Sequence, residues 1–219
     1  MRIVAISDVH TRWADIKIPP CDVLISAGDY SFRGQEYVVR GFHAWLREQP
    51  ARHVISVQGN HELWVEKNFL EAKRIAQEEC PGVHFIEEDM LEIEGVKFWC
   101  SAWTPEFGQW AWNAQRGNEI SKHWDIIPDD IDVFVTHGPP YGVLDEVHEV
   151  RMGVERYEHV GCYDLMRAVK RVKPDLHFFG HIHQGYGQFH KDGTSFYNAS
   201  ICDERYWPTN LPHVVEYEK

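Results

Sequence analysis

Five short apolar segments of this chain are each followed directly by side chains that bind metal ions or transfer protons. These side chains are Asp8 and His10, Asp29, Asn60 and His61, His137, and His181 and His183. Carboxylate, amide and imidazole groups form a mixed ligand set without thiolate, which suits manganese, iron, zinc or similar ions better than it suits a structural zinc site. Seven or so ligands exceed the need of one ion. The set therefore predicts two ions, and the Asp29 carboxylate could bridge them.

The segment Val57–Glu62, with the sequence Val-Gln-Gly-Asn-His-Glu, illustrates how such a strand end is built. Residues 54–57 form a short, mostly β-branched apolar run, which predicts a buried strand. Gly59 then allows a sharp turn, and Glu62 could pair with the His61 ring or cap the segment that follows. Taken alone, this segment would fit a polar turn with an incidental histidine equally well. Five such ends in one chain favour a site.

Buried strands must hold these side chains in place. Apolar runs predict strands over residues 2–7, 22–27, 54–57, 132–136 and 176–179. Parallel strands in an α/β sheet place their carboxyl ends at one edge, where such proteins bind ligands. We therefore expect the five strand ends to converge on one site.

Helical periodicity appears in three further segments, residues 35–49, 66–79 and 163–172. The apolar stripe predicted for the first helix consists of Tyr37, Val38, Phe42, Trp45 and Leu46. These side chains are interpreted as core packing. The third helix is basic and amphipathic, and its charge is interpreted as a solvated face.

Residues 83–101 differ from the alternating strands and helices before them. Short apolar runs predict strands over 84–86, 90–93 and 96–100, with a hairpin turn at Glu94-Gly95, which is typical of antiparallel pairing. The aromatic segment 103–113 then predicts either an apolar wall beside a pocket or a cover for a sheet. Asn113 and Arg116 follow as candidate contacts for the sugar or phosphate of a substrate.

Length and charge narrow the range of functions. The chain has 219 residues and no repeat or evident boundary, so we expect one domain spanning 1–219. A net charge of −12 opposes an extended nucleic acid as partner and is compatible with a site that concentrates cations. Five scattered cysteines without a Cys-x-x-Cys pair argue against a disulfide framework or a zinc knuckle. No apolar run could span a bilayer and the first strand follows Met1 directly, which predicts a cytoplasmic protein without a membrane partner.

The ordered motifs Asp8-x-His10, Gly28-Asp29, Gly59-Asn60-His61-Glu62, His137 and Gly180-His181-x-His183 resemble the signature of the calcineurin-like metallophosphoesterases. This resemblance implies an α/β fold, a four-layer α/β/β/α sandwich of two mixed β-sheets flanked by helices. It also implies Asp8, His10 and His183 as ligands of the first metal ion and Asn60, His137 and His181 as ligands of the second. Asp29 would bridge the two ions, and His61 would act as the general acid.

Further segments are similar to the branch of metallophosphoesterase-domain-containing proteins, which is related to the class III cyclic-nucleotide phosphodiesterases. They cover residues 103–107, 113–117, 136–140, 198–200 and 208–212. Residues 28–34 are also similar to the Ser/Thr protein phosphatases, whose arginine there grips phosphate, so Arg33 is a candidate phosphate contact or merely a surface arginine. Phe32 and Gln58 stand where those enzymes carry an acid and an arginine, so a protein phosphatase is not expected.

The predicted function is a dinuclear metal-dependent phosphodiesterase that acts on small, including cyclic, nucleotides. Two nearby ions polarise the phosphoryl oxygens and generate a hydroxide for in-line attack, and His61 could protonate the leaving alkoxide. Manganese is the first expectation for both ions, with iron, zinc, nickel or cobalt as alternatives. A nucleotide-binding or scaffold protein with weak hydrolysis is one alternative, and a phosphomonoesterase or nuclease that uses the same metal site is another. The oligomeric state stays open.

Overall fold

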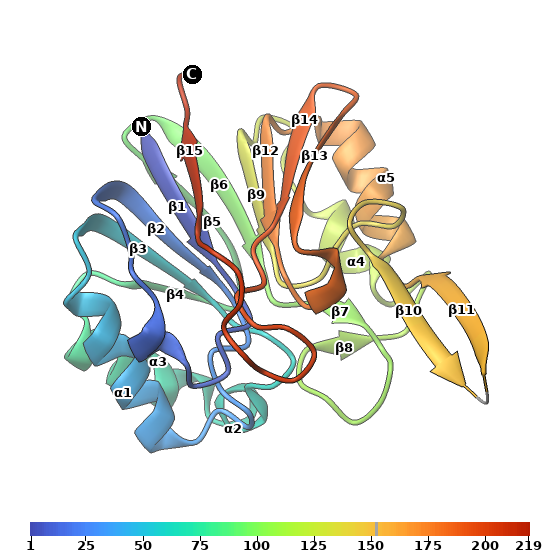
Figure 1. Cartoon of the computed structure of the whole chain (residues 1–219). Helices are drawn as coiled ribbons and strands as arrows, with labels where there is room; N and C mark the ends of the chain where they lie inside the picture. The colour runs from blue at the N-terminus through green and yellow to red at the C-terminus, as the bar shows by residue number, and fades with distance from the viewer. Residues whose placement is uncertain (152) are drawn as a thin grey trace.

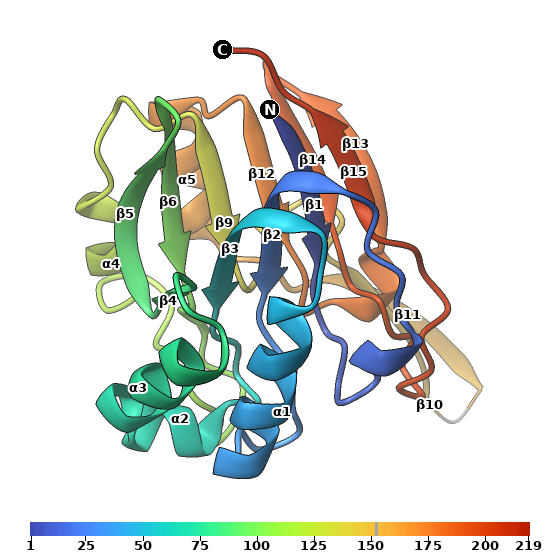
Figure 2. The same ribbon diagram turned by 90° about the vertical axis from the view of Figure 1, so that its left-hand side faces the viewer.

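The computed structural model describes residues 1–151 and 153–219. Two β-sheets pack face to face at the centre, and helices cover the outer face of each sheet (Figures 1 and 2). The apolar side chains of Phe98, Val133 and Phe178 point into the central core together with those of the first sheet. Their neighbours Trp99, Phe134 and Phe179 point the other way, into a second core beneath two helices. This alternation buries both faces of the second sheet, and the predicted four-layer sandwich is confirmed.

The first sheet has five strands in the order β15-β1-β2-β3-β4. Strands β1 to β4 are parallel, and β15 runs antiparallel to β1 at the edge. Because three of the parallel strands are nearly continuous apolar runs, they are buried on both faces. The bounds are β1 Arg2–Ile6, β2 Cys21–Ala27, β3 Ala51–Val57, β4 His84–Ile86 and β15 His213–Glu216.

The second sheet has six strands in the order β13-β14-β12-β9-β6-β5. The four inner strands are parallel, and the two edge strands pair antiparallel with their neighbours. The bounds are β5 Glu88–Ile93, β6 Val96–Ser101, β9 Val133–Thr136, β12 Leu176–Phe179, β13 Gly187–Lys191 and β14 Thr194–Asn198. Two small ribbons complete the β-structure: β7 Thr104–Pro105 with β8 Asn113–Ala114, and β10 Glu146–Arg151 with β11 Val154–His159.

The helices form the outer layers of the sandwich. On the first sheet lie α1, α2 and α3, and on the second lie α4 and α5 (Figure 1). Their bounds are α1 Glu36–Arg47, α2 Leu63–Lys67, α3 Phe69–Glu79, α4 Ser121–Asp125 and α5 Tyr163–Val172, with 3₁₀ turns at Trp13–Asp15 and His183–Gly185. No helix among the described residues is long and apolar enough to cross a membrane.

Three predictions about these elements were wrong. Tyr37 is 72% exposed, because the buried face of α1 uses Val38, Val39, Phe42, His43 and Leu46. The helix predicted over residues 66–79 is two helices, since Asn68 leaves the helical conformation at φ −132° and separates α2 from α3. Strand β4 pairs parallel with β3 in the first sheet, so it does not belong to the antiparallel β5–β6 hairpin.

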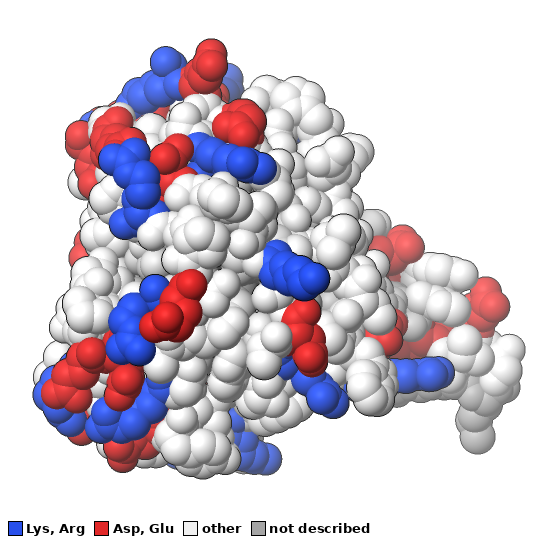
Figure 3. Space-filling model, turned by 60° about the vertical axis from the view of Figure 1, so that its left-hand side comes forward, with Lys and Arg blue, Asp and Glu red and all other residues white. Residues whose placement is uncertain are grey.

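Charged side chains alternate in sign over the outer helices of the first sheet. Arg40 on α1 pairs with Glu36 at 3.2 Å and with Glu79 at 3.0 Å, and Arg74 on α3 pairs with Glu71. Figure 3 shows the mixed pattern on this face, where basic groups lie among acidic ones. Such exposed pairs contribute little to stability individually, and they leave no large basic surface on this side.

Candidate metal centre

The predicted site residues follow strands of both sheets. Strands β1, β2 and β3 of the first sheet and β9 and β12 of the second end on the same side of the sandwich (Figure 1). Backbone hydrogen bonds join the end of β1 to that of β2 (Asp8 N to Gly28 O, 3.0 Å) and the end of β12 to that of β9 (Gly180 N to His137 O, 2.9 Å). A bond of 2.8 Å from Ser7 N to Ala199 O connects the first sheet to the second. The prediction that the five strand ends converge is confirmed.

Sharp turns carry the candidate ligands away from their strands. Asp8, His10, Asp29 and His181 adopt left-handed conformations, with φ of 52°, 40°, 54° and 69°. Residues other than glycine take this conformation uncommonly, although Asp and His do so more often than most, and such residues cluster at functional sites. These turns bring the four side chains into clusters of possible metal ligands.

The first group of candidate ligands consists of Asp8, His10 and His183, whose ligand atoms all lie within 4.8 Å of one another. The Nε2 atoms of the two histidines are 3.3 Å apart, and His183 Nε2 lies 3.4 Å from Asp8 Oδ1. Each ring donates its Nδ1–H to a backbone carbonyl, of Ser31 at 3.1 Å and of Asp203 at 2.9 Å, which turns Nε2 toward the other ring. In the neutral form of each ring the Nε2 lone pair faces the other nitrogen, an arrangement suited to holding a metal ion between them.

The two oxygens of the Asp8 carboxylate differ in their contacts. Its Oδ2 accepts hydrogen bonds from the backbone nitrogen of His181 at 2.8 Å and from the Ser200 hydroxyl at 2.9 Å. Its Oδ1 is buried and has no hydrogen-bond partner among the described residues. A buried carboxylate oxygen without a partner is costly, and a metal ion would remove that cost.

The second group of candidate ligands consists of Asn60, His137, His181 and Asp29. His137 donates Nδ1–H to Ala27 O at 2.8 Å, and its Nε2 lies 2.8 Å from Asn60 Oδ1 and 3.3 Å from Asp29 Oδ2. Asp29, His137 and His181 form a further cluster with ligand atoms within 4.8 Å. The ring nitrogen of His137 thus faces two oxygen acceptors, an arrangement that also suits a metal ion held by the three side chains.

Asp29 lies where the two groups meet. It belongs to the cluster with His137 and His181 and also to a cluster with His10 and His61. A Cβ atom on Gly59 would lie 2.3 Å from Asp29 Oδ1, so only glycine at this position leaves room for the carboxylate. The residue type of Gly59 is therefore explained by the approach of Asp29 as well as by the turn.

The electrostatics of the site favour positive charge. Although burial opposes the change, His183 holds the pKa of Asp8 well below its usual range, and His137 does the same for Asp29. In return, and again against burial, Asp29 raises the pKa of His137 to about 9 and Asp8 raises that of His183 to about 9. The donor set, the facing nitrogens and the unpartnered Asp8 Oδ1 all fit metal ions.

His61 stands beside the two groups with its ring partly exposed. Its Nδ1–H donates to Phe32 O at 3.2 Å, and its Nε2 lies 3.9 Å from Asp29 Oδ2. Its backbone nitrogen donates to Asp29 Oδ1 at 2.8 Å. The ring can therefore offer a proton at Nε2 or add a ligand, since it forms a possible metal cluster with His10 and Asp29.

Sequence analysis missed the role of Glu62. Its buried carboxylate does not pair with His61. It accepts backbone N–H groups of Asp29 and Gly59, both at 2.9 Å, and the N–H and hydroxyl of Ser31 at 3.0 and 2.7 Å. Burial and the charge of Asp29 raise the pKa of Glu62 to about 8, while its hydrogen-bond donors oppose that rise. The side chain holds the ends of β2 and β3 together.

Aromatic side chains surround the candidate ligands. Trp110 lies over the His61 ring with centroids 4.4 Å apart, and Tyr206 meets the His10 ring edge-on at 4.7 Å. Phe107 contacts the His181 ring at 5.1 Å. The aromatic segment 103–113 thus contributes to the wall of the site, while Trp112 is buried in the core. Sequence analysis did not identify Tyr206, since the resemblance to related proteins covers only residues 198–200 and 208–212 on either side of it.

The three candidate substrate contacts lie in different environments. The Arg33 side chain is exposed. Asn113 donates to Thr104 Oγ1 at 2.9 Å and Ala111 O at 3.0 Å, and its Oδ1 is buried without a partner among the described residues. Arg116 donates to Gly161 O at 2.7 Å and Val160 O at 2.6 Å and lines a cavity of about 400 Å³ beside His181. Both bonds tie Arg116 to the chain before α5, which reduces its freedom to bind phosphate.

Comparisons with known proteins agree with this geometry. The family model for calcineurin-like phosphoesterase matches residues 1–185. The chain is 34% identical over 235 residues to human metallophosphoesterase domain-containing protein 1, covering 98% of this chain and 70% of that protein. A UPF0046 protein of Caenorhabditis elegans is 30% identical over 214 residues, covering 93% and 71%. The crystal structure of phosphopantetheinyl hydrolase from Mycobacterium tuberculosis shares the fold, with a TM-score of 0.65, 18% identity and coverage of 97% and 95%.

Proposed function

This chain belongs to the calcineurin-like phosphoesterase family, and from that premise we propose that it is a dinuclear metal-dependent phosphodiesterase acting on small diesters, cyclic nucleotides foremost. One observation carries the proposal: Asp29 shares one cluster with His137 and His181 and another with His10 and His61. A carboxylate in that position is suited to bridge two ions. Asp8, His10 and His183 would hold one ion, and Asn60, His137 and His181 the other.

The bound ions would supply Lewis acidity toward the phosphoryl oxygens and lower the pKa of a water molecule; manganese is proposed for both, with iron, zinc, nickel or cobalt as alternatives. The protein's own part is to orient the substrate and to move one proton. When the bond from phosphorus to the leaving oxygen breaks, the leaving alkoxide needs that proton. His61 would donate it from Nε2, because its Nδ1–H is held by Phe32 O at 3.2 Å.

The choice of a small nucleotide rests on the walls of the site. Trp110 and Phe107 present aromatic rings beside His61 and His181, where a base could stack. Arg33, with its exposed side chain, is the freest of the three candidate phosphate or sugar contacts, whereas Asn113 and Arg116 are held by protein hydrogen bonds. The net charge of −12 argues against an extended nucleic acid as substrate.

The test is hydrolysis of bis-p-nitrophenyl phosphate, p-nitrophenyl phosphate and 2′,3′- and 3′,5′-cyclic AMP by protein stripped of metal and then given Mn²⁺. We expect turnover only with added metal and faster turnover of diesters than of the monoester. Preference for the monoester, or cleavage of oligonucleotides instead, would replace the proposal by a phosphomonoesterase or nuclease. Tight nucleotide binding without turnover, with Mn²⁺ and also with iron, zinc, nickel or cobalt in its place, would indicate a binding protein.

A further inference from the structure

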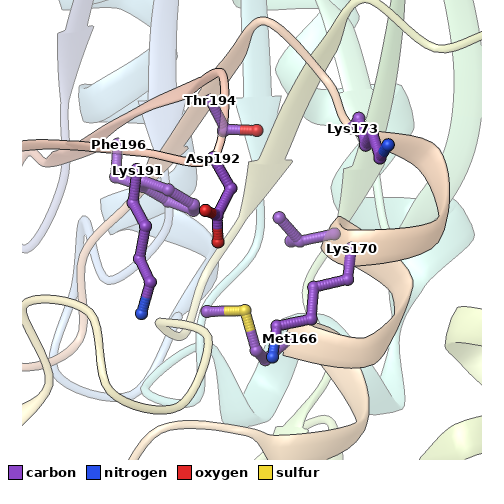
Figure 4. Close-up of a pocket in the computed structure, with 8 residues that line it drawn as sticks. Met166, Lys170, Lys173, Lys191, Asp192, Thr194 and Phe196 are labelled. Atoms are coloured by element: carbon purple, nitrogen blue, oxygen red, sulfur yellow. The ribbon is translucent and has the colours of Figure 1, made fainter.

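A second cavity of about 400 Å³ lies between α5 and the β13–β14 hairpin (Figure 4). None of its lining residues is a candidate metal ligand. They are Met166, Val169, Lys170, Lys173, Lys191, Asp192, Thr194 and Phe196. The proposed phosphodiesterase activity does not use this cavity.

The helix and the hairpin each contribute apolar and basic groups to the cavity. Met166, Val169 and Lys170 recur at intervals of three and four residues, which places them on one face of α5, and Lys173 is the C-cap residue that follows the helix. Phe196 of β14 and Val169 are buried and form part of the apolar floor. The methylene stems of the lysines extend this apolar surface, because a lysine side chain is polar only at its end.

Three of the nine lysines of the chain gather around this cavity. The ammonium groups of Lys170, Lys173 and Lys191 make no hydrogen bond or ion pair with the described residues, so all three are available to a ligand. In a protein of net charge −12, three such lysines around one cavity create a local preference for anions. Lysines near a helix C-terminus often serve only the helix dipole, but Lys191 belongs to β13 and lies across from the helix.

Figure 4 shows how the polar ends are arranged. Lys191 and Asp192 extend from the hairpin on one side, and Lys170 and Met166 lie on α5 on the other, while the Lys173 ammonium turns outward. The Asp192 carboxylate points into the space between hairpin and helix. This single negative group disfavours a ligand that is anionic at both ends. The Asp192 carboxylate could also accept a hydrogen bond from a hydroxyl group of the ligand.

We propose that this cavity binds a small organic anion with one phosphate or carboxylate group and an apolar body. The anionic group would lie between Lys170 and Lys191, and the apolar body would contact Met166 and Phe196. The volume suits a ligand of this kind, since small-molecule sites are commonly cavities of about 300–1,000 Å³ with an apolar wall and a few polar groups.

The experiment uses the full chain loaded with zinc, with its methionine methyl groups labelled with ¹³C. The sequence has four methionines, and Met166→Leu assigns the signal of interest. Phenylphosphonate and octanoate are titrated separately and distinguish a phosphate-like from a carboxylate ligand. We expect at least one of them to shift the Met166 signal saturably. Inorganic phosphate should bind at least tenfold more weakly, and equal binding would overturn the apolar part of the proposal.

Charge reversal locates the site. The double variant Lys170→Glu, Lys191→Glu should weaken binding at least tenfold, and both side chains are exposed, so folding is preserved. The matched variant Lys17→Glu, Lys122→Glu changes the net charge equally at two other exposed lysines and should bind within twofold of the parent. An unmoved Met166 signal with both probes, or equal weakening in the two variants, would overturn the proposal. Because the readout is binding, it is independent of phosphodiesterase activity.

Discussion

The carboxylate of Glu62 accepts a hydrogen bond of 2.9 Å from the backbone nitrogen of Asp29, 33 positions earlier in the chain. The same oxygen accepts the N–H of Gly59 at 2.9 Å, and the other oxygen accepts two hydrogen bonds from Ser31. One buried acid therefore fixes the turn after β2 against the turn after β3. The position of the Asp29 side chain depends on this contact.

Glu62→Gln should weaken Mn²⁺ binding by about 10- to 100-fold, the usual effect of losing a group that orients a metal ligand. Each carboxylate oxygen of Glu62 accepts two hydrogen bonds. In glutamine an NH₂ group replaces one oxygen, and two donors then lose their acceptor. Calorimetric titration of metal-free protein with Mn²⁺ measures the effect. Glu218→Gln, at an exposed position, is the matched control. Equal affinity in the two variants would contradict the positioning role of Glu62.

The strands that carry the candidate ligands were predictable because local sequence determines them. Apolar runs such as Leu24-Ile25 in β2 and Phe178-Phe179 in β12 are buried, and the Gly-Asp or Gly-His pair that follows marks the end of each strand. The role of Glu62 was not predictable, because its donors come from turns that are distant in sequence. Only the tertiary structure brings them together.

Other elements carry too little local signal. The ribbon of β10 and β11 is exposed along the whole of β11, so no alternation of buried and exposed residues marks it. Helix α4 has five residues, too few for a helical period to show. The direction of β4 depends on its choice of β3 as partner, which a three-residue apolar run cannot encode. These elements are determined by packing.

His61→Ala should retain its metal ions and lose turnover most for poor leaving groups. A general acid contributes about 10²- to 10⁴-fold, and an alkoxide needs its proton more than p-nitrophenolate does. The measurement is kcat for diesters with aryl and alkyl leaving groups, together with metal content by mass spectrometry. It separates the role of the ring as general acid from a role as metal ligand. His190→Ala, at an exposed histidine of β13, is the control. Loss of metal in His61→Ala would instead make His61 a ligand, in line with its cluster with His10 and Asp29.

Asp29→Ala should reduce the bound metal from two ions per chain to one or fewer and should lower turnover by at least about 100-fold. The carboxylate is the nearest anion to His137 Nε2, at 3.3 Å, and belongs to two of the ligand clusters. Metal content after dialysis against Mn²⁺ is the measurement, with the exposed Asp125→Ala as control. Full dinuclear occupancy in Asp29→Ala would show that the carboxylate does not bridge.

His43 makes the stability of the fold dependent on pH without involving the metal centre. The ring is buried between α1 and β3, where Nδ1 donates to Val39 O at 2.8 Å and Nε2 lies 3.2 Å from Ser56 Oγ. Burial lowers its pKa to about 4, compared with about 6.5 in an unfolded chain. Between these two pKa values His43 is protonated in the unfolded chain and neutral in the folded chain. Stability therefore rises with pH across this window and is lost as the pH falls from about 6.5 toward 4.

His43→Gln removes this titration and keeps a polar side chain beside Ser56. Between pH 7.5 and pH 4.5 the parent protein should lose about 2 kcal/mol more unfolding free energy than the variant. In the parent, protonation of His43 stabilises only the unfolded chain, and the glutamine of the variant cannot take up a proton. Urea unfolding of metal-free protein at several pH values measures both, and His190→Gln, at an exposed histidine, should behave like the parent. Parallel pH profiles for parent and His43→Gln would mean that the pKa of His43 is the same in the folded and unfolded chains, so that the folded ring also gains the proton below about pH 6.5. The hydrogen bond to Val39 O would persist in that case, but Nε2 would then donate to Ser56 Oγ.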